Sequence, residues 1–162
     1  MELSRKIAKL GTGEAWASLV NACYRWLKPL SAAGMVHKLE SKGFDKIRSK
    51  YANPDDKTGW PKYVDAAHWL NLAIRQARGL HLDRRPPLRI LDIGSGAGYF
   101  LFVCKQFGHA VMGLDLDWPL MYAEMFELLQ IPRQIWRIEP FQPLPDLGVR
   151  FDLVTGFAVC FN

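Results

Sequence analysis

The chain has 162 residues, of which 49% are hydrophobic and 23% charged, and its formal net charge is +5. This length suits one ordinary domain, and the composition excludes a disordered chain or a fibrous repeat. No apolar run approaches the roughly 20 residues that a membrane span needs, and the first residues lack the pattern of a secretory signal, so we expect a soluble, cytoplasmic protein.

Charge is unevenly distributed along the chain. Residues 1–90 contain 17 Lys and Arg against 8 Asp and Glu, a balance of +9, whereas residues 91–162 contain 4 against 8, a balance of −4. The basic residues are scattered and no RNA-binding motif accompanies them, which favours solvated helix faces over a nucleic-acid surface. RNA, anionic lipid or an acidic partner is the alternative.

The cysteines and histidines do not indicate a metal site. Cys23, Cys104 and Cys160 are widely separated and lie in apolar stretches, which is typical of buried, reduced thiols. The histidines lack the spacing of the common zinc motifs. We therefore predict no metal.

The first half of the chain has a helical pattern. Residues 1–50 predict two or three helices, with breaks at Gly or Pro positions such as Gly43, and a long helix is predicted from Pro61 to Gly79. We assign residues 1–79 to an N-terminal helical region that packs on the following domain or caps its binding site. The aromatic residues that could contribute to such a cap, with core packing as the alternative, are Trp60, Tyr63 and Trp69.

From residue 88 onward, strands and helices alternate. The predicted strands are 88–93, 110–115, 134–139 and 150–157, with helices at 97–107 and 118–130 between the first three. The first, second and fourth strands are apolar enough to be buried on both faces, like central strands of a parallel sheet. The expected fold class is α/β, a Rossmann-like, doubly wound parallel sheet that binds ligands at the carboxyl ends of its first two strands.

Three glycines on alternate positions follow the first predicted strand. In ILDIGSGAGYF, Gly94, Gly96 and Gly98 permit a sharp turn, close approach of a ligand to the backbone and the start of a helix. NAD, FAD, a sugar nucleotide or S-adenosylmethionine could use such a loop. A dinucleotide fingerprint would need glycine at position 99, where this chain has Tyr99. Asp115 ends the second strand, where a carboxylate can accept hydrogen bonds from both ribose hydroxyls.

These motifs resemble those of a known family. The stretches ILDIGSGAGYF, VMGLDLD and FDLVTGF, in that order, are similar to strand motifs of the class I S-adenosylmethionine-dependent methyltransferases, over about residues 88–160. The resemblance implies S-adenosylmethionine as cofactor and methyl transfer as activity. It identifies neither the catalytic residues nor the acceptor, for which a small molecule is one option, and the oligomeric state stays open.

The resemblance also implies roles for individual residues. The glycine loop would hold the methionine part of the cofactor, Asp92 would order that loop, Asp115 would hold the ribose, and Leu116 would pack on the adenine. Glu139 is a candidate adenine contact, although it lies one residue before the family's usual acidic position, which Pro140 occupies here. The residues implied in cofactor binding are Asp92, Ile93, Gly94, Ser95, Gly96, Gly98, Asp115, Leu116 and Glu139.

Four predicted strands are fewer than the seven usual in this family. We therefore expect residues 80–162 to be a cofactor-binding domain that is incomplete at its C-terminus, as in a truncated methyltransferase. A compact variant whose fourth strand is covered by the N-terminal helices or a second copy is the alternative. Two other functions stay open: a non-catalytic cofactor-binding remnant or interaction protein and, less favoured, an NAD-dependent oxidoreductase.

Overall fold

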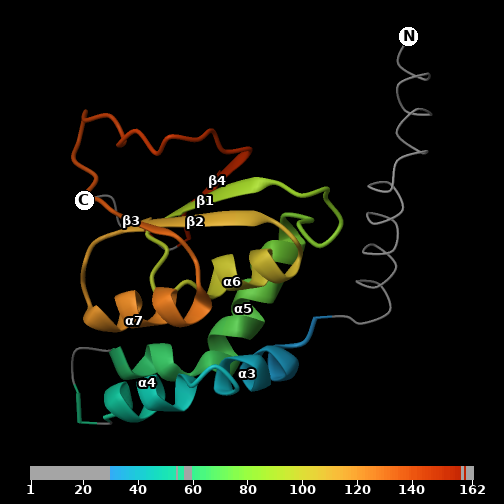
Figure 1. Cartoon of the computed structure of the whole chain (residues 1–162), viewed down its shortest axis with the longest axis vertical. Coiled ribbons are helices and arrows are strands. Elements are labelled where there is room, and N and C mark those ends of the chain that lie inside the picture. Colours follow the sequence, from blue (N-terminus) through green and yellow to red (C-terminus); the bar gives the residue numbers. More distant parts are fainter. Residues whose placement is uncertain (1–29, 54, 57–59, 158, 160–162) are drawn as a thin grey trace. The chain divides into compact units, whose positions relative to one another are not determined.

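The computed structural model describes residues 30–53, 55–56, 60–157 and 159 (Figure 1). Met1–Leu30 and Ser31–Asn162 form separate units, and the second contains all the elements described below. Cys23, Cys160 and the helices predicted before residue 30 lie outside the described residues. The helices between residues 31 and 79 belong to the same unit as the sheet. Within the described residues, no helix is both long enough and apolar enough to cross a membrane.

Three α-helices and a 3-10 helix precede β1 in the described part of the chain, after which strands and helices alternate up to β3, as the sequence predicts. Their order is α3 (Ala32–Glu40), α4 (Phe44–Tyr51), the 3-10 helix η1 (Trp60–Val64), α5 (Ala66–Gly79), β1 (Arg89–Ile93), α6 (Tyr99–Gln106), β2 (Ala110–Asp115), α7 (Leu120–Leu129), β3 (Arg133–Ile135) and β4 (Leu153–Thr155). The strands form one parallel sheet in the order β3-β2-β1-β4. The expected α/β, Rossmann-like fold class is confirmed, because the order reverses between β1 and β4 as at the switch point of a doubly wound sheet.

The helix predicted from Pro61 to Gly79 is divided into two elements. Asp65 caps the start of α5, because its carboxylate accepts a hydrogen bond from the His68 N–H at 3.0 Å. An aspartate cap satisfies one of the free N–H groups of a first helical turn and thereby begins a new helix. Residues 60–64 instead form η1, which places Tyr63 beside the carboxyl ends of the strands.

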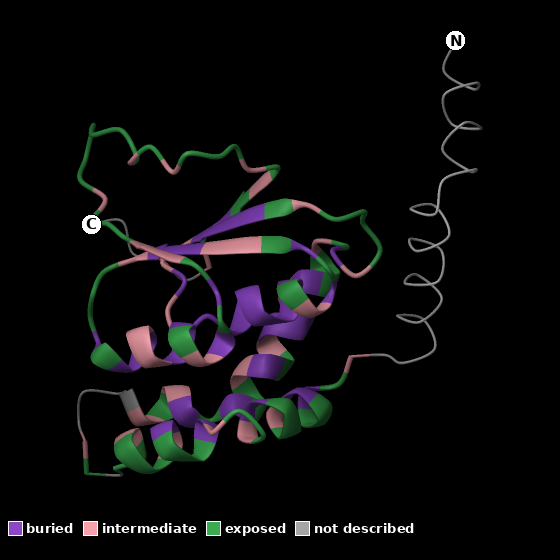
Figure 2. Ribbon diagram, viewed as in Figure 1, coloured by how far each residue is buried: buried purple, intermediate pink, exposed green. Residues whose placement is uncertain are grey.

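The described helices lie on one face of the sheet. In Figure 1, α6 and α7 lie directly beneath β1 and β2, and α3 and α4 lie farther from the sheet. Figure 2 shows the buried residues gathered along β1, α6 and the inner sides of α5 and α7. Residues 136–152 cross the other face as irregular chain, without a covering helix.

The third and fourth strands are shorter than predicted. β3 ends at Ile135 instead of residue 139, and Pro140, Pro143 and Pro145 follow, none of which has an N–H to donate to a neighbouring strand. The expectation that the fourth strand is buried on both faces is wrong. β4 forms the edge of the described sheet and leaves Val154 54% exposed, because no described helix covers it there.

His109 fastens the segment before β1 to the start of β2. Its ring is buried, its Nδ1 accepts a hydrogen bond from the Leu88 N–H at 3.1 Å, and its Nε2 lies 2.8 Å from the Leu82 carbonyl oxygen. Both contacts are satisfied together only by a neutral ring that carries its proton on Nε2. This histidine therefore has a structural role that needs no ligand.

Replacing His109 by alanine should destabilise the fold. The change removes two buried hydrogen bonds and leaves the Leu82 carbonyl and Leu88 N–H without their partner, so we expect a loss of roughly 2–3 kcal/mol in the free energy of unfolding. Urea denaturation measures it. The exposed His37, changed to alanine, is the matched control and should leave stability within roughly 0.5 kcal/mol. Equal effects of the two changes would contradict the role given to His109.

Candidate functional site

The glycine loop connects the end of β1 to the start of α6. Gly94, Gly96 and Gly98 all have positive φ angles, of 66°, 54° and 76°, a backbone region that other residues rarely adopt. The Gly98 N–H donates to the Ser95 carbonyl at 3.0 Å, which closes the turn immediately before α6. The left-handed glycines therefore bring the backbone across the carboxyl ends of the strands, as the sequence predicts.

Phe126 of α7 supports the glycine loop from below. A side-chain carbon added at Gly98 would lie 3.0 Å from the Phe126 ring, and one added at Gly113 of β2 would lie 2.6 Å from it. Glycine at these two positions leaves room for the ring between loop, sheet and helix. Gly98 thus has a packing role in addition to its conformational one.

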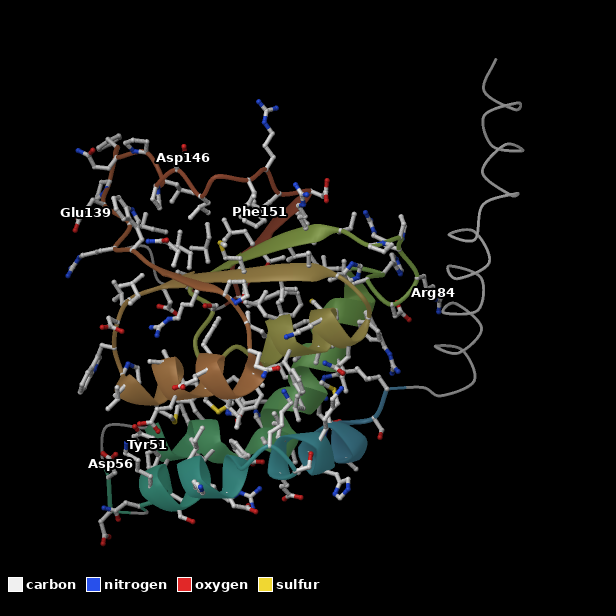
Figure 3. All side chains as sticks on the ribbon, in the orientation of Figure 1. Tyr51, Asp56, Arg84, Glu139, Asp146 and Phe151 are labelled. Carbon is white, nitrogen blue, oxygen red and sulfur yellow. The ribbon has the colours of Figure 1, made fainter. Side chains whose placement is uncertain are left out.

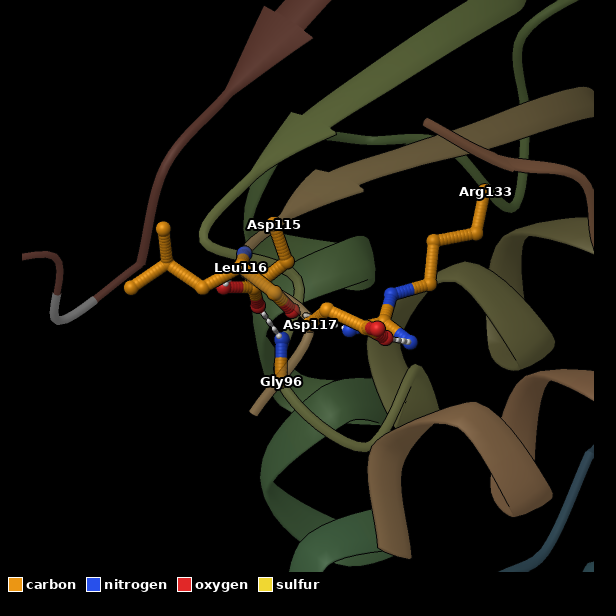
Figure 4. Close-up of polar contacts among 5 residues, drawn as sticks. All are labelled: Gly96, Asp115, Leu116, Asp117 and Arg133. Atoms are coloured by element: carbon orange, nitrogen blue, oxygen red, sulfur yellow. Dashed lines mark hydrogen bonds and ion pairs between the residues drawn. The ribbon is translucent and has the colours of Figure 1, made fainter. Parts of the chain in front are cut away.

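Asp115 ends β2 and is joined to the glycine loop (Figure 4). Its Oδ2 accepts a hydrogen bond from the Gly96 N–H at 2.6 Å, and its Oδ1 accepts one from the Leu116 N–H at 2.7 Å. A carboxylate has about four lone-pair sites, so each oxygen can still accept a bond from a ligand hydroxyl. The side chain is thus fixed in place and retains hydrogen-bonding capacity.

Asp92 is the second acid of the site and is almost fully buried. Its Oδ1 accepts a hydrogen bond from the Thr155 hydroxyl of β4 at 2.7 Å. Burial raises the pKa of the Asp92 carboxyl to about 6; the Thr155 hydrogen bond lowers this pKa and the Asp115 charge raises it. Asp92 thereby connects β1 to β4 directly beneath the glycine loop.

A cavity of about 320 Å³ lies between the glycine loop, η1 and α5. Of its described lining, Asp92 and Asp115 carry carboxylates, and no lining residue is a lysine, arginine or histidine. Ser95 also belongs to this lining, but its hydroxyl is buried near Gly113 and has no hydrogen-bond partner among the described residues. The lining residues are Tyr63, Trp69, Leu72, Ala73, Gln76, Asp92, Gly94, Ser95, Gly96, Ala97, Gly98, Tyr99, Phe100, Asp115, Tyr122, Phe157 and Val159.

Aromatic side chains form one wall of the cavity. The rings of Tyr63 and Trp69 are stacked with centroids 4.9 Å apart, and Tyr63 meets Tyr122 edge to face at 5.7 Å. The Tyr99 hydroxyl donates to the Tyr63 carbonyl at 2.8 Å, which ties η1 to the first turn of α6. Tyr63 and Trp69, two of the three aromatic candidates for a cap, therefore reach the site, whereas the Trp60 side chain lies outside the described part.

Six of the nine residues implied in cofactor binding line this cavity: Asp92, Gly94, Ser95, Gly96, Gly98 and Asp115. Ile93 precedes the loop within β1, and Leu116 follows Asp115 with its side chain 45% exposed. Glu139 lies on the irregular connection after β3, paired with Arg137 at 2.9 Å (Figure 3). The structure does not bring Glu139 to the cavity, because β3 ends four residues before it.

Sequence reasoning missed Thr155 and Tyr122, which complete the site. Thr155 reaches Asp92 through the pairing of β1 with β4, and the Tyr122 ring lies 3.8 Å from the position of a side-chain carbon at Gly96. Neither contact follows from local spacing, because each joins segments far apart in the chain. Among the described residues, no group of three or more His, Cys, Asp or Glu side chains could hold a metal ion.

Fold and site together define an α/β protein with a glycine-loop ligand site at the carboxyl ends of β1 and β2. No protein-family model and no curated protein matches the chain. Among solved structures, it is similar to S-adenosylmethionine-bound CalS10, an amino pentose methyltransferase from Micromonospora echinaspora involved in calicheamicin biosynthesis. The match has 33% identity and a TM-score of 0.42, and covers 54% of this chain.

The chain spans 36% of the length of that solved protein. The match is limited to part of each chain.

The raised pKa of Asp92 predicts a specific dependence of stability on pH. Because the folded chain holds this proton more tightly than the unfolded chain, the contribution of Asp92 is complete below the ordinary pKa of 3.8 and is lost as the pH rises through about 6. Asp92→Asn removes this titration. The free energy of unfolding of the variant should exceed that of the wild type by roughly 1–3 kcal/mol near pH 7 and should equal it near pH 4.

Urea denaturation of both proteins across this pH range checks the expectation, with the exposed Asp55→Asn as control. A difference between variant and wild type that is the same at both ends of the range would contradict the placement of a buried, ionisable acid beneath the loop.

Proposed function

We propose that this chain binds S-adenosylmethionine in the cavity at the glycine loop and serves methyl transfer to an acceptor. The observation that carries the proposal is the charge of the lining, which contains two carboxylates and no basic side chain among the described residues. A dinucleotide would bring a negatively charged diphosphate against these acids, where repulsion disfavours it. A nucleoside that carries a sulfonium cation has the opposite charge and is attracted.

The residues present also fit such a nucleoside in their hydrogen-bonding capacity. Asp115 retains acceptor sites for ribose hydroxyls, while its bonds to the Gly96 and Leu116 N–H groups fix its orientation.

When bound, S-adenosylmethionine would supply a methyl group activated on sulfur. An acceptor nucleophile would bond to the methyl carbon in line as the carbon–sulfur bond breaks, with S-adenosylhomocysteine as the leaving group. The protein residues have to hold and shield the reactants. Tyr63, Trp69 and Tyr122 line one side of the cavity, and the glycine loop lines the other. The cavity volume suits a small-molecule ligand. As a separate part of the proposal, the acceptor is a small molecule.

Titration calorimetry of the full chain with S-adenosylhomocysteine tests the proposal. We expect binding of S-adenosylhomocysteine and none of NAD. Asp115→Ala should weaken binding by roughly 2–4 kcal/mol, the value of one or two hydrogen bonds to a charged group.

Asp146→Ala is the matched control, because Asp146 is exposed on the connection between β3 and β4 and does not line the cavity (Figure 3). Its affinity should equal that of the wild type. Binding of NAD instead of S-adenosylhomocysteine would contradict the proposal and restore the oxidoreductase alternative.

A further inference from the structure

The side chain of Arg133 extends toward the turn that follows β2 (Figure 4). It is the first residue of β3, and its side chain is only 7% exposed. Its guanidinium donates a hydrogen bond to the Leu116 carbonyl and lies 3.8 Å from the Asp117 carboxylate. One side chain from β3 therefore holds both residues that directly follow Asp115.

The same turn is joined to the glycine loop through Asp115. The Asp115 carboxylate accepts from the Gly96 N–H and from the Leu116 N–H, so its orientation depends on where Leu116 lies. Arg133 fixes the carbonyl of that same residue. The position of the Asp115 oxygens therefore depends on Arg133, although Arg133 does not line the cavity.

The stability of the fold does not account for an arginine at this place. The Arg133 Nε is buried and has no hydrogen-bond partner among the described residues, and Asp117 is 67% exposed, which makes a weak ion pair. Its other contact is with the Phe126 ring, 5.6 Å from the guanidinium carbon. An apolar side chain of similar length often replaces an incompletely paired buried charge without loss of stability.

We propose that Arg133 is a positioning residue for nucleoside binding, which acts through the turn at Leu116 and Asp117 to orient the Asp115 carboxylate. The proposal rests on the proposed function, because Asp115 is the group that would meet the ribose. In this proposal β3 supports the site through Arg133, although none of its residues lines the cavity. Arg133 itself touches no ligand.

Arg133→Met tests the proposal, because methionine fills the space without the two contacts to the turn. The dissociation constant for S-adenosylhomocysteine, measured by calorimetry, should rise by roughly tenfold or more, while the melting temperature stays equal or rises. In an Asp115→Asn background, the same change should have little effect, because the carboxylate that Arg133 orients is absent. Such non-additive effects of the Arg133 and Asp115 substitutions on affinity distinguish a positioning role from a general structural one.

Amide hydrogen exchange gives a readout that needs no ligand. We expect the Leu116 N–H to exchange faster in Arg133→Met, since the Leu116 carbonyl is released from the guanidinium.

Arg133→Lys is the conservative variant. It keeps the charge but offers one ammonium in place of a fork of donors, so its affinity for S-adenosylhomocysteine should lie between those of wild type and Arg133→Met. If Arg133→Met does not fold, Arg133→Lys carries the comparison of affinity and exchange.

Arg48 offers a matched control. Its guanidinium also lies over a phenylalanine ring, Phe44, at 5.1 Å and pairs with an aspartate, Asp45, at 2.9 Å, but it does not line the cavity. Arg48→Met should leave the affinity for S-adenosylhomocysteine unchanged. This variant shows what the loss of a stacked arginine does to the fold alone.

Wild-type affinity in the Arg133 variants, together with unchanged exchange at Leu116, would overturn the positioning role and leave the proposed function intact. An equal loss of affinity with and without the Asp115 carboxylate would also overturn it. Failure of the wild-type chain to bind S-adenosylhomocysteine would instead overturn the proposed function, and the positioning role with it.

Discussion

The hydrogen bonds of the Asp115 carboxylate are the interaction on which the site depends. They connect the glycine loop after β1 to the turn after β2. Because the two strands are parallel and adjacent, their carboxyl ends lie side by side, and a single carboxylate can bridge them. Cavity, glycine loop and turn are therefore parts of one arrangement.

The packing beneath this bridge leaves little freedom to the loop. Phe126 occupies space that any side chain at Gly98 or Gly113 would need, and Arg133 lies against the same ring. Close packing of this kind means that a change in one of these side chains shifts its neighbours. The site is thus supported by α7, which also contributes Tyr122 to the cavity wall, and by β3, none of whose residues lines the cavity.

The sequence predicted the elements and residues that follow from local chemistry. Alternation of apolar strands with helices identified the parallel sheet. Gly94 was placed at the site because it directly follows a strand, and Asp115 because it ends one. The predictions were wrong for β3, which ends at Ile135, and for β4, which the lack of a covering helix leaves exposed. Thr155 and Arg133 act across strand pairings, which spacing along the chain does not reveal.

The anchoring of Tyr63 connects the cavity wall to helices that follow it in the chain. Its carbonyl accepts a hydrogen bond from the Tyr99 hydroxyl of α6, and its ring stacks on Trp69 of α5. Because interiors are close-packed, a shift of either helix moves this wall, so the shape of the cavity is sensitive to substitutions in the core between α5 and α6.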